Sequence, residues 1–270
     1  MSFSIAGKTA VVTGAANGVG LAVARHFVAR GANVMFADMD EARLIEEIGQ
    51  VSEDEDGTTA YFVGDLREKL NVANLLSATI DRFDRADILV NASRQMLSSD
   101  PLNPDDDAVI EALNQNLMTS LRLTQVFAKR MIKQAKADEE QESPAGSIIN
   151  LSSIAARRTQ PELLAYSVSS AALDQMTRSM AVALAPHRIR VNAIALGSVM
   201  SASLQGAIQE NEEFRDQIIE STPLQRIASP KELAEVAQFL ASDGSGFMTG
   251  QILTVDGGRT LVDAAEAPAH

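Results

Sequence analysis

The stretch KTAVVTGAANGVGLAVARHFVARG, residues 8–31, combines three local patterns in a fixed order. It begins with a short apolar run rich in valine and threonine, which predicts a β-strand over 8–14. A turn with glycines at positions 14, 18 and 20 follows, and apolar residues then recur at helical spacing until Gly31. A strand, a glycine-rich turn and a helix in this order are typical of the first unit of a dinucleotide-binding fold.

The turn TGAANGVG, residues 13–20, has the composition that a bound phosphate needs. A phosphate can approach the backbone closely where no Cβ stands, and the start of a helix offers free N–H groups and the positive end of its dipole. Asp38 stands about 20 residues further, at the end of the next apolar run. There its carboxylate would accept hydrogen bonds from ribose hydroxyls and repel a 2′-phosphate, which favours NAD(H) over NADP(H). The alternative is that Asp38 caps the next helix.

The rest of the chain repeats this alternation of strand and helix. Further strands are expected at 33–38, 59–65, 86–93, 146–153, 188–196 and 250–258. Helices are expected at 18–31, 41–51, 69–83, 106–134, 162–185 and 229–242, with a helical excursion over 202–220. The alternation predicts an α/β protein with a doubly wound Rossmann fold, in which a seven-stranded, mostly parallel sheet carries helices on both faces.

The organisation of the chain predicts one domain over residues 1–270, because no linker of low complexity divides it. Residues 197–228 follow the carboxyl end of an expected strand, where lids over ligands are built, so we expect a substrate lid there.

The composition excludes several classes of function. The net charge of −13 opposes binding to nucleic acid and to anionic lipid. The chain has no cysteine, which removes disulfides and thiolate sites and suits a cytoplasmic protein. Its three histidines show no metal-ligand spacing, so no metal site is expected. Neither a spanning apolar run nor a signal-peptide pattern is present, so we expect no membrane partner.

Several ordered motifs resemble the short-chain dehydrogenase/reductase family, over almost the whole chain. They are the turn 13–20, GDL (64–66), LNQNLMTS (113–120), IINLSS (148–153), RVNAIALGSV (190–199) and TGQILTVDGG (249–258). Tyr166 follows Ser153 with twelve residues between them, which is the usual spacing of the family.

This resemblance implies hydride transfer between NAD(H) and a small carbonyl or secondary alcohol. Tyr166 would be the general acid or base, Ser153 would hold the substrate oxygen, and Asn116 would hold its helix and a proton-relay water. The implied cofactor-binding residues are Thr13, Gly14, Asn17, Gly18, Val19, Gly20, Asp38, Asp65, Leu66, Asn91, Tyr166, Ser170, Gly197, Val199 and Ser201. The resemblance also implies a homotetramer or dimer, paired through the two long helices and the last strand.

Three positions depart from the family's pattern. Ser170 stands where the family has the lysine of Tyr-x-x-x-Lys, whose charge favours the ionised tyrosine. Arg94 replaces a glycine, and Leu196 replaces a proline. A tyrosine without such help has a pKa of about 10 and is a poor base at neutral pH, so we expect either a bias toward carbonyl reduction or an alcohol oxidation that needs high pH. Arg94, Arg157 and Arg158 are candidates for an electrostatic substitute for the lysine, which would not relay a proton. The alternative is that they are surface arginines on loops.

The departures leave three functions open. The first is an NAD(H)-dependent oxidoreductase with a modified proton relay. The second is a dinucleotide-binding relative with weak or no catalysis, acting as a binding or regulatory protein, because the departures gather in one site. The third keeps the enzyme but changes the reaction to a dehydration or isomerisation. The sequence favours the first, because the family's substrate-contacting residues Ser153 and Tyr166 are retained.

Overall fold

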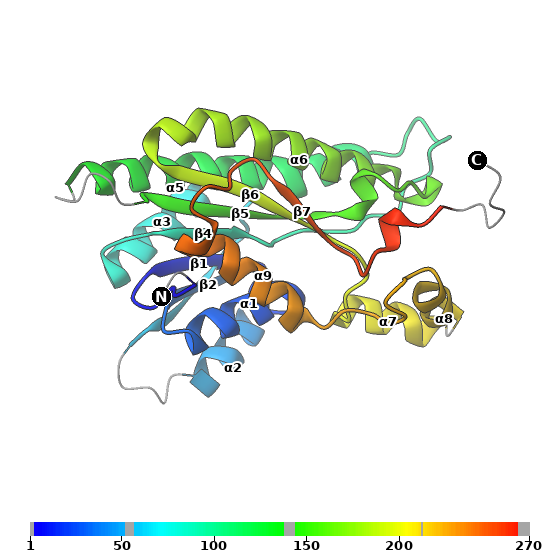
Figure 1. Ribbon diagram of the computed structural model, residues 1–270, viewed down its shortest axis with the longest axis horizontal. Helices are drawn as coiled ribbons and strands as arrows, with labels where there is room; N and C mark the ends of the chain where they lie inside the picture. Colours follow the sequence, from blue (N-terminus) through cyan, green and yellow to red (C-terminus); the bar gives the residue numbers. More distant parts are fainter. Residues whose placement is uncertain (1–2, 52–56, 138–143, 212, 264–270) are drawn as a thin grey trace.

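The computed structural model describes residues 3–51, 57–137, 144–211 and 213–263 (Figure 1). The strands are β1 (Thr9–Thr13), β2 (Asn33–Asp38), β3 (Thr59–Val63), β4 (Ile88–Asn91), β5 (Gly146–Ser153), β6 (Ile189–Leu196) and β7 (Ile252–Val255). The helices are α1 (Gly18–Ala29), α2 (Glu41–Val51), α3 (Lys69–Phe83), α4 (Ala108–Ala112), α5 (Thr119–Ala137), α6 (Leu164–Leu184), α7 (Ala202–Glu210), α8 (Glu213–Glu220) and α9 (Pro230–Ala241). The expected strands and helices are confirmed with small shifts at their ends, except for the helix expected over 106–134.

The seven strands form one sheet in the order β3-β2-β1-β4-β5-β6-β7. Every pairing between these seven strands is parallel. The expected α/β fold class is therefore confirmed, and the sheet, which was expected to be mostly parallel, is parallel throughout these strands. The direction of winding reverses between the neighbours β1 and β4. In open sheets of this kind, ligands bind outside the carboxyl ends of the strands at that reversal.

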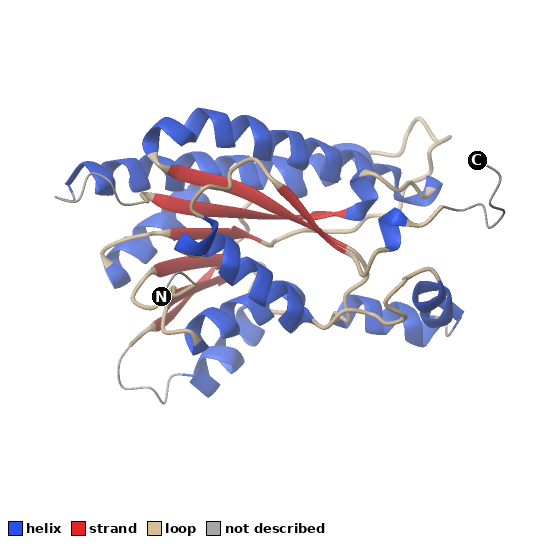
Figure 2. Ribbon diagram, in the orientation of Figure 1, coloured by secondary structure: helices blue, strands red, loops and turns tan. Residues whose placement is uncertain are grey.

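Helices cover both faces of the sheet (Figure 2). On one face, α1, α2 and α9 pack on the strands around a core that includes Val12, Phe27 and Leu240. On the other face, α3, α5 and α6 enclose a second core that includes Leu75, Phe127 and Ile148. The strands β1, β5 and β6 are buried at every position, and the buried positions of β5 and β6 include polar residues such as Asn150 and Asn192.

The helix expected over 106–134 is not one continuous α-helix. Between α4 and α5, residues Leu113–Met118 form a π-helical turn that contains Asn116. Such turns are rare and are found frequently at functional sites. The apolar periodicity on either side does not reveal the turn.

Residues 197–228 follow β6 at its carboxyl end and contain α7 and α8. The two helices lie beside one another at one end of the sheet (Figure 1). Within the described ranges, no helix is both long enough and apolar enough for a membrane crossing.

Candidate functional site

The glycine turn joins β1 to α1 and is constrained by the chain's own packing. A Cβ on Gly20 would lie 2.1 Å from the carbonyl oxygen of Gly14. A Cβ on Gly14 would lie 2.9 Å from backbone atoms of Ala92 and Ser93, which follow β4. Gly14 and Gly18 also have positive φ angles of 66° and 57°, which favour glycine. The glycines therefore bring the turn, the start of α1 and the end of β4 into close contact.

Asp38 joins the end of β2 to this turn. Its Oδ2 accepts a hydrogen bond from the N–H of Ala16 at 3.0 Å, and its Oδ1 accepts one from Met39 at 2.7 Å. The cap of α2 is instead Asp40, whose Oδ1 accepts from the N–H of Arg43 at 3.2 Å. The alternative role for Asp38, as the cap of α2, is therefore wrong.

Thr13 and Asn91 hold the ends of β1 and β4 together beneath the turn. The Thr13 hydroxyl accepts hydrogen bonds from the N–H groups of Ala92 and Ser93, at 3.0 and 3.1 Å. The Asn91 amide donates to Oδ1 of Asn150 at 2.8 Å. The Asn91 Oδ1 is buried and has no partner within the described residues. A bound group or an ordered water commonly satisfies such an acceptor.

Asn116 fastens the π-helical turn to its surroundings. Its Nδ2 donates to the carbonyl of Gln95 at 2.9 Å and to Oγ of Ser169 at 3.1 Å. Its Oδ1 accepts from the N–H of Gln95 at 2.8 Å. Asn116 thereby links the segment after β4 to α6, in the turn that follows Tyr166.

Ser153 and Tyr166 are both buried, at the end of β5 and in the first turn of α6. The Ser153 Oγ accepts a hydrogen bond from the N–H of Ala155 at 3.1 Å, which caps a short 3-10 helix. Ser170 lies one turn beyond Tyr166 on α6 and is also buried.

Arg94 is the side chain that reaches the Tyr166 hydroxyl. Its Nη1 donates to that hydroxyl and also lies 3.4 Å from the carbonyl oxygen of Ser152. Its guanidinium carbon lies 5.8 Å from the centroid of the Tyr166 ring. Arg157 and Arg158 bond instead to the Thr254 hydroxyl and the Thr260 carbonyl, near β7. Of the three arginines considered from the sequence, Arg94 is the one with a hydrogen bond to Tyr166.

Asp174 is a buried carboxyl on α6 that the sequence analysis did not select. It follows Ser170 by one turn, is 4 % exposed, and its Oδ1 has no partner among the described residues. Burial raises the pKa of Asp174, while the Ser152 hydroxyl and the charges of Arg157 and Arg178 oppose that shift. An acidic residue within the buried face of a helix is the signal that would have identified it.

The remaining predicted residues lie at the same edge of the sheet or close to it. Val19 and Leu66 are buried, and the carbonyl of Asn17 accepts the N–H of Leu21 in the first turn of α1. The N–H of Gly197 donates to Val255 at 3.0 Å, and the N–H of Ser201 donates to Val199 at 2.7 Å. These contacts order the start of the segment 197–228.

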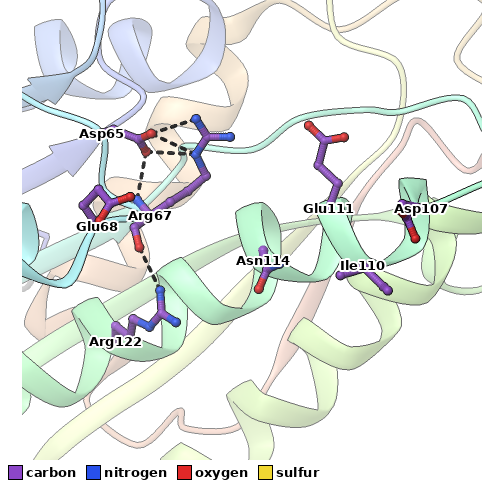
Figure 3. Close-up of a pocket in the computed structure, with 8 residues that line it drawn as sticks. All are labelled: Asp65, Arg67, Glu68, Asp107, Ile110, Glu111, Asn114 and Arg122. Atoms are coloured by element: carbon purple, nitrogen blue, oxygen red, sulfur yellow. Dashed lines mark hydrogen bonds and ion pairs between the residues drawn. The ribbon is translucent and has the colours of Figure 1, made fainter.

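Asp65 faces a pocket of about 520 Å³ between the start of α3 and the helices α4 and α5 (Figure 3). Arg67 forms a forked ion pair with Asp65, with Nη2 2.7 Å from Oδ2, and this contact holds the pKa of Asp65 below its usual range. The other lining residues are Glu68, Asp107, Ile110, Glu111, Asn114 and Arg122. This pocket does not include Ser153, Asn116 or Tyr166, and its mixed charges mark no reaction centre. Among the described side chains, those of this pocket included, no cluster of three or more potential metal ligands occurs.

Comparisons with known proteins agree with the fold and with the motifs. A family model described as enoyl-(acyl carrier protein) reductase matches residues 14–260. An uncharacterized oxidoreductase of Mycobacterium tuberculosis is 34% identical over 260 residues, covering 96% of this chain and 94% of that protein. Cis-4-hydroxycyclohexanecarboxylate dehydrogenase of Sinomonas cyclohexanicum is 32% identical over 262 residues, covering 97% and 100%.

Among solved structures, 7 alpha-hydroxysteroid dehydrogenase complexed with NADH and 7-oxo glycochenodeoxycholic acid is similar. It matches with a TM-score of 0.85 and 28% identity, covering 95% of this chain and 96% of that one.

Proposed function

The chain belongs to the short-chain dehydrogenase/reductase family, and we propose that it is an NAD(H)-dependent oxidoreductase with a modified proton relay. Its substrate is a small carbonyl or secondary alcohol, and it transfers a hydride between that substrate and the nicotinamide. The observation that carries the proposal is the hydrogen bond from Arg94 to the Tyr166 hydroxyl. It puts a positive charge beside the candidate acid at the site where Ser170 has replaced the family's lysine.

The residues present fit a nicotinamide dinucleotide. The glycine turn at the start of α1 would hold its phosphates, and Asp38 would accept its ribose hydroxyls. Asp38 accepts hydrogen bonds from three backbone N–H groups, two at Oδ1 and one at Oδ2, which leaves one lone pair, on Oδ2, for a ribose hydroxyl. Arg43, the nearest basic residue in sequence, faces Asp40 at 3.4 Å, which supports NAD(H) over NADP(H).

The other cofactor contacts that we assign are Thr13, Asp65, Leu66, Asn91, Ser170, Gly197, Val199 and Ser201. When it is bound, NAD(H) supplies or accepts the hydride.

The proton steps fall to the protein's own side chains. In reduction, the Tyr166 hydroxyl donates its proton to the substrate oxygen, which the Ser153 hydroxyl holds. Arg94 stabilises the negative charge that then remains on the Tyr166 oxygen. Because an arginine does not give up its proton, Arg94 acts by charge alone, and a solvent proton must restore Tyr166. Asn116 is a positioning residue, since its bonds to Gln95 fix the segment that carries Arg94.

The same proposal extends to the organisation of the protein. We assign residues 1–270 to one domain, because one sheet uses strands from Thr9 to Val255. We assign 197–228 the role of a lid, because this segment follows the carboxyl end of β6. We further propose a cytoplasmic homotetramer or dimer that pairs through α5, α6 and β7 and binds neither nucleic acid nor membrane.

The proposed relay is tested by removing the positive charge at position 94 and placing one at position 170, where the family has its lysine. The four proteins compared are the wild type, Arg94→Gly, Ser170→Lys and the double variant. We expect Arg94→Gly to lower the rate of carbonyl reduction on the order of 10²–10⁴-fold, and the double variant to recover most of that loss. Single-turnover reduction of a panel of carbonyls gives the rate, and nicotinamide fluorescence gives cofactor affinity. Arg30→Met, at an exposed position on the far end of α1, is the control. An unchanged rate in Arg94→Gly would overturn the relay.

A second candidate, a dinucleotide-binding protein without catalysis, has one specific observation in its favour. The hydrogen bond from Arg94 occupies the Tyr166 hydroxyl, which a substrate oxygen must also reach. Cofactor binding without turnover in all four proteins would support this candidate. Turnover of the substrate without net oxidation of the cofactor would support the dehydration or isomerisation instead.

A further inference from the structure

The helix α6, which carries Tyr166, begins without a cap of its own. Leu163 occupies the cap position, and its apolar side chain cannot accept a hydrogen bond from the N–H groups of the first turn. One of these N–H groups belongs to Ala165, which is completely buried and therefore cannot rely on water as an acceptor. The acceptor for Ala165 must come from another part of the chain.

Ser99, in the segment after β4, provides that acceptor. Its Oγ accepts a hydrogen bond from the N–H of Ala165 at 3.1 Å. Its own N–H donates to the carbonyl oxygen of Glu162, in the turn that leads into α6, at 2.9 Å. Ser99 is itself buried, so water competes little for these bonds. A serine that lies 66 residues away in the chain thus takes the place of a helix cap directly before Tyr166.

The segment that contains Ser99 also carries Arg94, whose Nη1 donates to the Tyr166 hydroxyl. Asn116 binds both the N–H and the carbonyl of the residue after Arg94, and its amide also donates to Oγ of Ser169. The Ser169 hydroxyl in turn donates to the carbonyl oxygen of Tyr166 at 3.1 Å. The segment is therefore connected to the first turns of α6 near Arg94 and again at Ser99, with Tyr166 between the two connections.

We propose that Ser99 is a positioning residue for proton transfer by Tyr166; the inference rests on the proposed function. Its hydroxyl holds the start of α6 against the segment after β4, and this contact fixes the Tyr166 hydroxyl in its place against Arg94. The Ser99 side chain binds the backbone of α6, so it acts through Tyr166 and not on the substrate. A displacement of about 1 Å in a reacting group can cost on the order of 10²-fold in rate. Loss of the Ser99 hydroxyl should therefore slow the chemical step and leave NADH affinity nearly unchanged.

The first test measures single-turnover carbonyl reduction and NADH affinity in full-length variants. We expect Ser99→Ala to slow reduction roughly 10- to 100-fold, and Ser99→Thr, which keeps a hydroxyl that can cap a helix, to recover most of that loss. Ser242→Ala is the matched control and should keep the rate of the wild type. Ser242 is also buried and caps the 3-10 helix Asp243–Ser245, but it lies at the amino end of β6, where its carbonyl accepts from Arg190. A wild-type rate in Ser99→Ala, or equal slowing in Ser99→Ala and Ser99→Thr, would overturn the inference.

A double-mutant cycle tests whether Ser99 acts on the contact between Arg94 and Tyr166. If it does, Ser99→Ala should slow reduction much less in Arg94→Gly than in the wild type, because the contact that Ser99 holds is already absent. The same factor in both backgrounds would show that Ser99 does not act on this contact, and the inference would be wrong.

A measurement without substrate separates this inference from the proposed function. The chain has two tyrosines and no tryptophan, so in Tyr61→Phe the fluorescence of the protein comes from Tyr166. Tyr166 is buried, so acrylamide should quench this fluorescence weakly. We expect the quenching constant to rise roughly threefold when Ser99→Ala is added, because the start of α6 then opens more often, and to stay the same with Ser242→Ala. Unchanged quenching in Ser99→Ala would overturn the inference. Raised quenching in a protein that reduces no carbonyl would support the positioning of Tyr166 by Ser99 and count against the proposed oxidoreductase.

Discussion

The glycine turn and the surroundings of Tyr166 lie at the same edge of the sheet, but they are held in different ways. In the turn, backbone meets backbone, and a Cβ on Gly20 would lie 2.1 Å from the Gly14 oxygen. Around Tyr166, side chains make the contacts, and the long side chain of Arg94 reaches the Tyr166 hydroxyl from the segment after β4. A charge carried on a side chain can move from one element to another without changing the backbone. The side chains around Tyr166 can therefore change while the glycine turn stays as it is.

The largest effect is expected from a methyl group added to the turn, in Gly20→Ala. The added Cβ forces α1 away from Gly14, so we expect NADH affinity to fall by about 100-fold or more, with loss of several kcal/mol of stability. NADH fluorescence titration and urea unfolding measure the two effects.

The matched control is Gly49→Ala, in α2, where a Cβ meets nothing within 4 Å. This substitution should stabilise the protein by up to about 1 kcal/mol, because alanine is the better helix former. Normal NADH affinity in Gly20→Ala would show that the turn is not fixed by packing.

The second-largest effect is expected from removing the hydroxyl of Tyr166. Tyr166→Phe removes the proposed proton donor and the partner of Arg94 but leaves the ring, so we expect carbonyl reduction to slow on the order of 10²–10⁴-fold. Cofactor affinity should change little. Tyr61→Phe removes the only other tyrosine hydroxyl of the chain, at an exposed position on β3, and should leave the rate unchanged. Equal rates for Tyr166→Phe and the wild type would exclude Tyr166 as the acid.

A smaller effect is expected from Asp38→Asn. The loss of a charged acceptor for the ribose hydroxyls should weaken NADH binding roughly 10- to 100-fold and reduce the preference over NADPH. Parallel titrations with the two cofactors measure both changes. Asp40→Asn tests the neighbouring helix cap, and it should alter stability without altering that preference. An unchanged preference in Asp38→Asn would remove the basis for assigning NAD(H).

The smallest effect is on stability and depends on pH. Because burial raises the pKa of Asp174, the folded protein keeps this proton at pH values where the unfolded chain has lost it. Stability from this group is therefore present in acid and is lost as the pH rises through the raised value. Asp174→Asn should add about 1 kcal/mol in mildly alkaline buffer and nothing in acid, as urea unfolding would show. Asp81→Asn, at an exposed position, is the control and should leave the pH dependence of stability unchanged. An effect of Asp174→Asn that is the same in acid and in alkaline buffer would contradict the prediction.

The sequence predicts the two sides of the comparison unequally, for a physical reason. Buried parallel strands are rich in apolar residues on both faces, so β1 (TAVVT) and β4 (ILVN) are visible as short apolar runs. The glycine turn is visible because no other residue fits it. The sequence did not decide which of Arg94, Arg157 and Arg158 contacts Tyr166. A pattern of residues does not show where a side chain that follows a strand points.

The π-helical turn was missed for a related reason. Its Asn116 side chain donates one hydrogen bond to the backbone of Gln95 and accepts another from it, and Gln95 lies 21 residues away in the chain. Local periodicity contains no information on such a contact. Asn116 was predicted as a site residue from the family resemblance. Its hydrogen bonds to the segment after β4 are visible only in the structure.

Asp38 has a consequence for the entropy of cofactor binding. Its carboxylate ties the glycine turn to the end of β2 through the N–H of Ala16. The backbone of the turn is therefore ordered by the protein itself, and a dinucleotide that arrives meets a surface already shaped for its phosphates. The conformational entropy of this loop is therefore lost when the protein folds and not when the cofactor binds. Association of NADH should then proceed in one step, without a slow rearrangement of the turn.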